Sequence, residues 1–220
     1  LIVVISLGTA TYSRNMVWRD KLTIWSDVVS KSPHNPRAHY NLGLAKFNGG
    51  DVQTAIASYE KAISLLPNYA QAHNNLGAAY KNTGKHDKAV THLEKAVELD
   101  PANDRACFNL GAIHHDAGRL AEAAASLERA IGTNPLNIDA LNRLGAVYLN
   151  QGKTEKAITC FEQVTGSAPD NAPAYNNLGF IRKSQGRLDE AAVYFEKTLA
   201  LDPELADGHF NLASLLAERG

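Results

Sequence analysis

The sequence has few of the residues that mark disulfide-rich, metal-binding and nucleic-acid-binding proteins. Its 220 residues include only two cysteines, Cys107 and Cys160. Two cysteines are too few for a disulfide framework, and they lack the Cys-x-x-Cys spacing of zinc and redox sites. Neither sign of charge is in excess, because 22 basic residues face 23 acidic ones. The sequence offers no positive stripe for a polyphosphate backbone, and we expect no nucleic-acid partner.

Catalytic and cofactor-binding motifs are missing as well. Gly152-Lys153-Thr154 resembles the end of a phosphate-binding loop, but Val147 stands where that loop needs a glycine. His114 and His115 are adjacent, and neighbours on a helix point about 100° apart, so the two do not easily share one metal ion. We therefore expect this segment to have no enzyme activity, no metal site and no cofactor.

What the sequence has instead is an internal period of 34 residues. A Leu-Gly pair recurs with this period from Leu42-Gly43 to Leu178-Gly179. Three further series keep the same phase: Gly50, Gly84, Gly118, Gly152 and Gly186; Ala55, Ala89, Ala123, Ala157 and Ala191; and Pro33, Pro67, Pro101, Pro135, Pro169 and Pro203. Four series in register indicate a chain built from one repeated structural element.

Each 34-residue period predicts two helices. In residues 36–69, apolar and small residues recur three or four apart, first at Ala38, Leu42, Gly43 and Ala45, then at Val52, Ala55, Ile56, Tyr59, Ala62 and Ile63. Gly50 separates the two faces, because glycine accepts the left-handed turn that follows a helix end. Pro67 ends the second helix. We expect Gly43 and its equivalents to let the two helices approach closely. The second helices also carry glutamates, Glu60, Glu94, Glu128, Glu162 and Glu196, which we assign to solvation and local charge pairing.

Segments such as NLGAAYKNTGKHDKAVTHLEKAVELDP (75–101) and NLGFIRKSQGRLDEAAVYFEKTLALDP (177–203) resemble the tetratricopeptide repeat. That resemblance implies an all-α solenoid, in which antiparallel helix pairs stack into a superhelix, and a groove that binds proteins or peptides. It divides the array at residues 36–220 into five whole repeats and the first helix of a sixth. The expected bounds are 36–69, 70–103, 104–137, 138–171, 172–205 and 206–220.

The N-terminal residues 1–35 predict a different environment. Residues 1–12 are apolar, and Tyr12 at their end, with Trp18 and the basic residues that follow, stands where interfacial anchors belong. We interpret residues 1–35 as the end of a transmembrane helix followed by a degenerate half-repeat, which gives a membrane-anchored protein. This order also resembles the junction in polytopic membrane proteins with C-terminal tetratricopeptide repeats, including relatives of transmembrane O-mannosyltransferases. The alternative is a cytoplasmic protein whose N-terminal helix covers the first repeat.

A polar residue recurs at one slot of the first helices, two residues before the Gly or Ala. Its members are Asn41, Asn75, Asn109, Arg143, Asn177 and Asn211. Asparagine is a poorer helix former than alanine, so the series needs a reason. The resemblance implies a ladder of amides facing the groove, similar to that of O-linked N-acetylglucosamine transferases. Such amides match the C=O and N–H groups of an extended peptide. The alternative is that each Asn bonds to the neighbouring repeat and fixes the stacking angle.

Aromatic side chains are the second group of candidate groove residues. They are Tyr40, Phe108, Phe180 and Phe210. Aromatic residues dominate the binding energy of many interfaces, although burial between repeats is an equal alternative here. We therefore interpret the chain as a scaffold for a protein or extended peptide. A different interpretation is a substrate-presenting array of a membrane-bound glycosyltransferase whose catalytic part lies upstream. Self-association through the uncovered apolar face of the last helix is a further interpretation.

Overall fold

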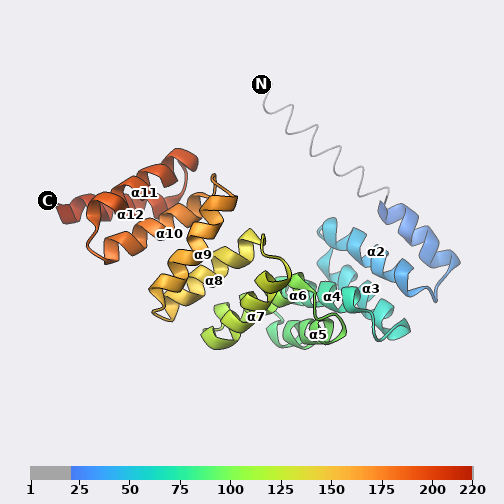
Figure 1. The fold of residues 1–220 in the computed structure, drawn as a ribbon. Coiled ribbons are helices and arrows are strands. Elements are labelled where there is room, and N and C mark those ends of the chain that lie inside the picture. Colours follow the sequence, from blue (N-terminus) through green and yellow to red (C-terminus); the bar gives the residue numbers. More distant parts are fainter. Residues whose placement is uncertain (1–20, 220) are drawn as a thin grey trace, which may run out of the picture. The chain divides into compact units, whose positions relative to one another are not determined.

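The structure is a computed structural model that describes residues 21–219. Over that range the chain forms α-helices joined by short turns and contains no strand. Residues 21–31 are helical. The helices that follow are α2 (Pro36–Asn48), α3 (Val52–Leu65), α4 (Ala70–Asn82), α5 (His86–Leu99), α6 (Asp104–Asp116), α7 (Leu120–Thr133), α8 (Ile138–Asn150), α9 (Thr154–Ser167), α10 (Ala172–Ser184), α11 (Leu188–Leu201) and α12 (Ala206–Arg219) (Figure 1). The all-α fold class predicted from the repeat is confirmed.

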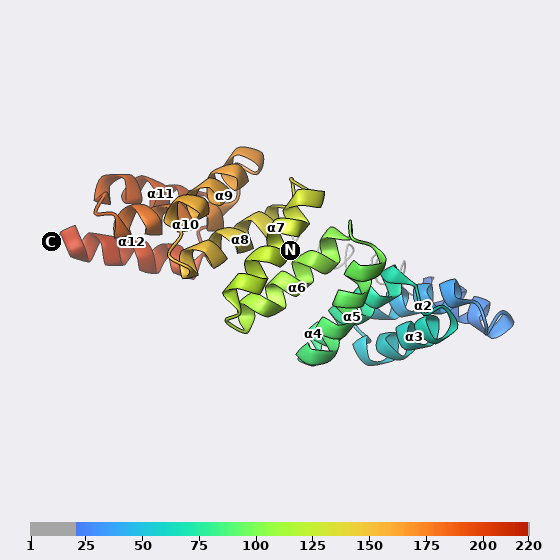
Figure 2. The same cartoon turned by 60° about the horizontal axis from the view of Figure 1, so that its bottom comes forward.

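The chain divides into two units, Leu1–Ile113 and His114–Gly220, which we call unit 1 and unit 2. Within unit 1, α2 packs against α3 and α4 against α5, and α3 contacts α4. Within unit 2, α8 packs against α9 and α10 against α11, and α9 contacts α10. A second view shows the same pairs lying side by side (Figure 2). The pairs α2–α3, α4–α5, α8–α9 and α10–α11 therefore each pack internally and against a neighbouring helix of the same unit.

The glycine between the two helices of each pair adopts the backbone conformation that the sequence predicts. The φ angles are 87° at Gly50, 73° at Gly84, 72° at Gly118, 71° at Gly152 and 74° at Gly186. These angles lie in the left-handed region, which side chains with a Cβ atom rarely occupy. The predicted helix-ending role of this series is confirmed.

A second glycine series lies where the two helices of a pair approach most closely. A Cβ atom added at Gly145 would lie 2.6 Å from the ring of Phe161, and one at Gly77 would lie 2.6 Å from Leu93. The corresponding distance from Gly43 to the ring of Tyr59 is 2.7 Å. Because nonbonded carbon atoms are normally about 3.5–4.0 Å apart, only glycine fits these crossings. Large side chains of the second helices thus fill the space that the first helices leave open.

The apolar faces predicted from the sequence form the core. In unit 1, Ile56, Tyr59, Leu76, Leu93 and Leu110 are among the buried residues of one continuous cluster. Phe195 and Leu215 belong to a buried cluster in unit 2. Both cysteines are buried, and burial raises the pKa of the Cys160 thiol to about 11. The thiol at position 160 is therefore protonated near neutral pH and is unsuited to nucleophilic chemistry.

Two of the glutamates assigned above to solvation and local charge pairing make a specific contact instead. The hydroxyl of Tyr80 donates a hydrogen bond of 2.5 Å to Glu60, and that of Tyr148 donates one of 2.5 Å to Glu128. In both cases the tyrosine belongs to the first helix of the next repeat. Burial and the neighbouring carboxylate raise the pKa of Tyr80 to about 12. The repeated Tyr–Glu bond links successive helix pairs, so our interpretation of these two glutamates was incomplete.

No helix within residues 21–219 combines the length and apolar character that spanning a membrane requires. The predicted end of a membrane span, residues 1–12, lies outside the described residues.

Candidate functional site

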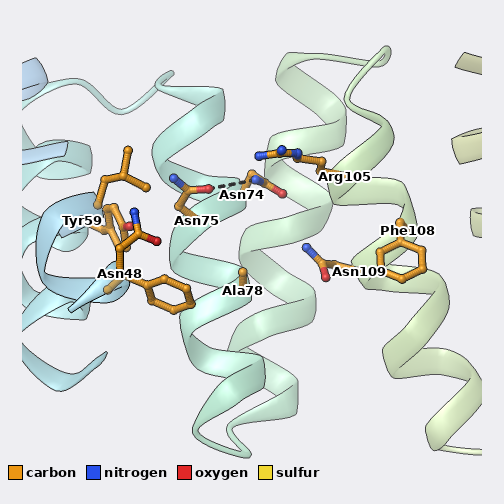
Figure 3. A pocket seen from close by; sticks show the side chains of 10 residues that line it. Asn48, Tyr59, Asn74, Asn75, Ala78, Arg105, Phe108 and Asn109 are labelled. Atoms are coloured by element: carbon orange, nitrogen blue, oxygen red, sulfur yellow. Dashed lines mark hydrogen bonds between the residues drawn. The ribbon is translucent and has the colours of Figure 1, made fainter. Parts of the chain in front are cut away.

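The first helices of three successive repeats enclose a pocket in unit 1. Its volume is about 260 Å³, and α2, α4 and α6 supply all but one of the side chains that line it (Figure 3). The apolar lining residues are Leu44, Phe47, Tyr59, Ala78 and Phe108, and the polar ones are Asn48, Asn74, Asn75, Arg105 and Asn109. The small side chain of Ala78 leaves space between larger neighbours on either side. The pocket therefore combines apolar walls with several amide groups and one charge.

Asn74 gives the pocket an unused hydrogen-bond acceptor. Its Nδ2 donates to Oδ1 of Asn75 at 3.0 Å, and Nδ2 of Asn75 donates in turn to the hydroxyl of Tyr40 at 3.1 Å. Asn74 is only 7% exposed, and its Oδ1 is buried without a hydrogen-bond partner among the described residues. A buried acceptor without a donor costs free energy, of the order of 1–3 kcal/mol. Because that oxygen is shielded from solvent, an N–H group of a ligand could recover this free energy only where a neighbouring side chain moves aside.

Arg105 is the charged residue among those that line the pocket. It is the second residue of α6, and its exposed side chain forms no ion pair within residues 21–219. A cation near a helix N-terminus opposes the helix dipole, so Arg105 does not stabilise α6 electrostatically. Lys81 lies nearby, since its Nζ is 5.8 Å from the centre of the Phe108 ring and 3.5 Å from Oδ1 of Asn109. The rim of the pocket is therefore basic.

Three of the ten predicted groove residues lie together in this pocket: Asn75, Phe108 and Asn109. Asn41 is partly buried, and its side chain has no hydrogen-bond partner within residues 21–219. Tyr40 is also partly buried, because its ring packs 6.0 Å from Tyr59 and 5.0 Å from Tyr69, measured between ring centres. The hydrogen bond between Tyr40 and Asn75 links two repeats, which is the geometry expected of the stacking alternative.

The other five predicted residues belong to unit 2. Arg143 forms an ion pair with Asp116 at 2.8 Å, and Nδ2 of Asn211 donates to Oδ1 of Asn176 at 3.0 Å. Asn177 is partly buried, whereas Phe180 and Phe210 are 51% and 73% exposed. Asn211, like Asn75, thus bonds across a repeat boundary. Ligand binding by the amide and aromatic residues stays a prediction.

Seven of the ten lining residues were not among the predicted groove residues, and they include Phe47, Asn48, Asn74 and Arg105. One signal was available, because Arg105 precedes Asn109 by four positions, and residues four apart share a helix face. For Phe47 and Asn48 the spacing places them near the end of the first helix, but it does not show which neighbour they face. Among the described residues, no group of three or more His, Cys, Asp or Glu side chains is placed to hold a metal ion.

Comparison with known proteins agrees with this architecture. Models of tetratricopeptide-repeat families match residues 45–84, 70–103, 114–179 and 172–205. A crystal structure of MamA is 32% identical in sequence with a TM-score of 0.69, and the match covers 75% of this chain and 96% of MamA. A fragment of MamA from Desulfovibrio magneticus RS-1 is 22% identical with a TM-score of 0.71, covering 78% and 97%. YrrB, described as a TPR protein with an unusual peptide-binding site, is 21% identical with a TM-score of 0.73, covering 84% and 96%. No curated protein sequence matches the chain.

Proposed function

Because the chain belongs to the tetratricopeptide-repeat family, we propose that it is a scaffold that binds an extended segment of another protein in the pocket between α2, α4 and α6. Proteins of this fold generally bind proteins or peptides and do not themselves catalyse reactions. The repeat bounds 36–69, 70–103 and 104–137 are part of the proposal, since each of these repeats contributes its first helix to the pocket.

The buried, unpaired oxygen of Asn74 is the observation that carries the proposal. It lies in a pocket whose other amides, Asn75 and Asn109, can donate and accept hydrogen bonds. An extended peptide presents an N–H and a C=O at every residue and can meet such amides without a particular side chain. The apolar walls, with Phe47 and Phe108, would then hold one large side chain of the bound segment.

The chain's similarity to MamA and YrrB supports a binding scaffold at the level of the family. The interpretation as part of a membrane-bound glycosyltransferase gains no support from the families and structures that match. Membrane attachment through residues 1–12 and self-association stay predictions.

Filling the pocket tests the proposal. Ala78→Phe places an aromatic ring where the pocket needs a small residue, and Ala146→Phe makes the same change on α8 of unit 2 as a matched control. Peptides that bind the full chain would first be selected from a random display library. We expect A78F to weaken their binding by about tenfold or more, the equivalent of one excluded apolar side chain, and A146F to have little effect. Equal affinities for both variants and the parent chain would overturn the proposed site.

A double variant separates groove amides from stacking amides. Asn75→Ala with Asn109→Ala removes two side chains whose ligand contacts would contribute about 0.5–1.5 kcal/mol each, so affinity should fall roughly 5- to 150-fold. The bond from Asn75 to Tyr40 is also lost, which lowers the melting temperature if stacking is the main role. A lower melting temperature with unchanged affinity per folded molecule would contradict the role in binding.

A further inference from the structure

Four of the six residues that α4 and α6 supply to the unit 1 pocket recur in unit 2 at a spacing of three repeats, or 102 residues. The amides and one aromatic ring are retained, in the pairs Asn74 and Asn176, Asn75 and Asn177, Asn109 and Asn211, and Phe108 and Phe210. The first member of each pair lines the pocket, and the second lies on α10 or α12. The contact between α10 and α12 and the bond from Asn211 to Asn176 bring these second members together. Unit 2 therefore carries a surface built on the same plan.

Two positions change character between the two surfaces. Ala78 corresponds to Phe180, and Arg105 corresponds to Asp207. Phe180 is 51% exposed and Phe210 is 73% exposed, so two aromatic rings project where unit 1 has a pocket. Oδ1 of Asn176 accepts from Asn211, whereas Oδ1 of Asn74 is unpaired. The surface in unit 2 thus presents exposed rings and a carboxylate in place of a cavity and a guanidinium.

The change of charge extends along one slot, the second residue of each first helix. That slot holds Arg37, Gln71 and Arg105 in unit 1, but Asp139, Pro173 and Asp207 in unit 2, so its charged members are basic in unit 1 and acidic in unit 2. The two cations nearest in sequence to Phe180 are already paired, Arg182 with Glu190 at 3.5 Å and Lys183 with Glu218 at 3.3 Å. Within residues 21–219, the exposed carboxylate of Asp207 forms no ion pair. The aromatic surface is therefore left with an uncompensated negative charge.

We propose that the surface of Asp207, Phe210 and Asn211 on α12, with Asn177 and Phe180 on α10, binds an extended peptide segment that carries Lys or Arg. The cation would pair with Asp207 and lie against the exposed face of Phe180 or Phe210, an arrangement that favours positive charge. Asn177 supplies a side-chain amide for the backbone of the segment. This inference takes its mode of binding from the proposed function and adds a second surface with the opposite charge preference.

Asp207 also lies in the first turn of α12, where a carboxylate stabilises a helix through its dipole. The dipole accounts for an acidic residue at this position, but not for the exposed ring of Phe210 three residues further along α12 or for that of Phe180 on α10. Binding and melting temperature must therefore be measured on the same variants.

Three capped decapeptides of Gly and Ser serve as probes, each with a central Leu flanked by two Lys, two Glu or two Gln. Titration into the ¹⁵N-labelled full chain is followed by NMR. We expect the Lys probe to shift the backbone signals of residues 176–180 and 207–211, and to bind there more tightly than the Gln and Glu probes. Asp207→Asn and Phe180→Ala should each weaken binding of the Lys probe about two- to fivefold.

Glu196→Gln is the matched control, because it removes the same charge from an exposed position on the second helix α11. We expect it to leave the affinity for the Lys probe unchanged. Equal losses in E196Q and D207N, or equal binding of the Lys and Glu probes at residues 176–180 and 207–211, would overturn the inference. The signals of residues 74–78 and 105–109 report on unit 1 separately. A failure of the proposed function there is thereby distinguished from a failure of this inference.

Discussion

Two glycines of the same helix pair should respond in opposite directions to the same substitution. Gly145 in α8 lies against Phe161, which is fully buried, and a Cβ atom there would be 2.6 Å from the ring. Gly166 in α9 is also helical, but no heavy atom outside its own helix turns lies within 4 Å of an added Cβ. Replacing either glycine with alanine improves helix propensity by about 0.5–1 kcal/mol. Only Gly145→Ala adds a steric conflict.

The conflict sets the magnitude of the difference. Extra methyl groups in a packed core destabilise by about 1–3 kcal/mol, because buried neighbours must leave their preferred positions. Gly166→Ala should therefore stabilise the chain by up to about 1 kcal/mol, whereas Gly145→Ala should fall about 1–3 kcal/mol below it. At about 2–4 °C per kcal/mol for a chain of this size, the two melting temperatures should differ by roughly 2–12 °C.

Thermal unfolding followed by circular dichroism at 222 nm, the standard helix signal, measures this difference directly. Equal melting temperatures for Gly145→Ala and Gly166→Ala would refute the reasoning that close helix approach selects glycine at position 145. The same logic applies to Gly77 and Leu93 in unit 1, where the added Cβ would also be 2.6 Å away.

Two further predictions concern the N-terminus and the link between repeats. If residues 1–12 end a membrane span, their deletion should improve solubility and preserve the helical content of residues 36–220; a lower melting temperature without a gain in solubility would favour the capping alternative. For Tyr80, a folded pKa near 12 lies above the unfolded value near 10, so its contribution to stability is complete below pH 10 and is lost as the pH rises toward 12. Tyr80→Phe should therefore reduce the fall in melting temperature between pH 10 and pH 12. An unchanged dependence of melting temperature on pH in this variant would show that ionisation of Tyr80 does not contribute to the fall.

The backbone could be predicted from the sequence because its requirements repeat. Gly50 and its equivalents need the left-handed conformation, and Gly43 and its equivalents lie against a large side chain, so the same residue type returns every 34 positions. Repetition makes each requirement visible several times over. The helix bounds and the buried faces follow from it without knowledge of any single contact.

The side-chain contacts between repeats could not be predicted in the same way, because they depend on residues that vary. Glu60 and Glu128 both bond to a tyrosine of the next repeat, but the corresponding slot holds His114 and Arg182 in other repeats. The ring of Tyr40, a groove candidate, packs against Tyr59 and Tyr69 of its own repeat, and its hydroxyl accepts a hydrogen bond from Asn75 of the next repeat. Whether a partly exposed side chain turns toward a neighbour or toward solvent depends on its length and on local partners, which periodicity does not encode.

Positions that repeat in every period and positions that vary among the repeats have different roles. Residues that repeat faithfully, such as Gly77 and Gly179, fix how each helix pair is built, so substitutions there act on stability before they act on binding. Residues that occupy equivalent slots but differ, such as Arg105 and Asp207, leave the backbone unchanged and alter charge at the surface. A solenoid can therefore acquire a new ligand preference in one unit by changing one slot, because neighbouring repeats hold the helices in place whatever that slot contains. In this chain the recurring amides are the basis of the proposed backbone contacts, and the residues that differ among repeats are the basis of the proposed charge preference.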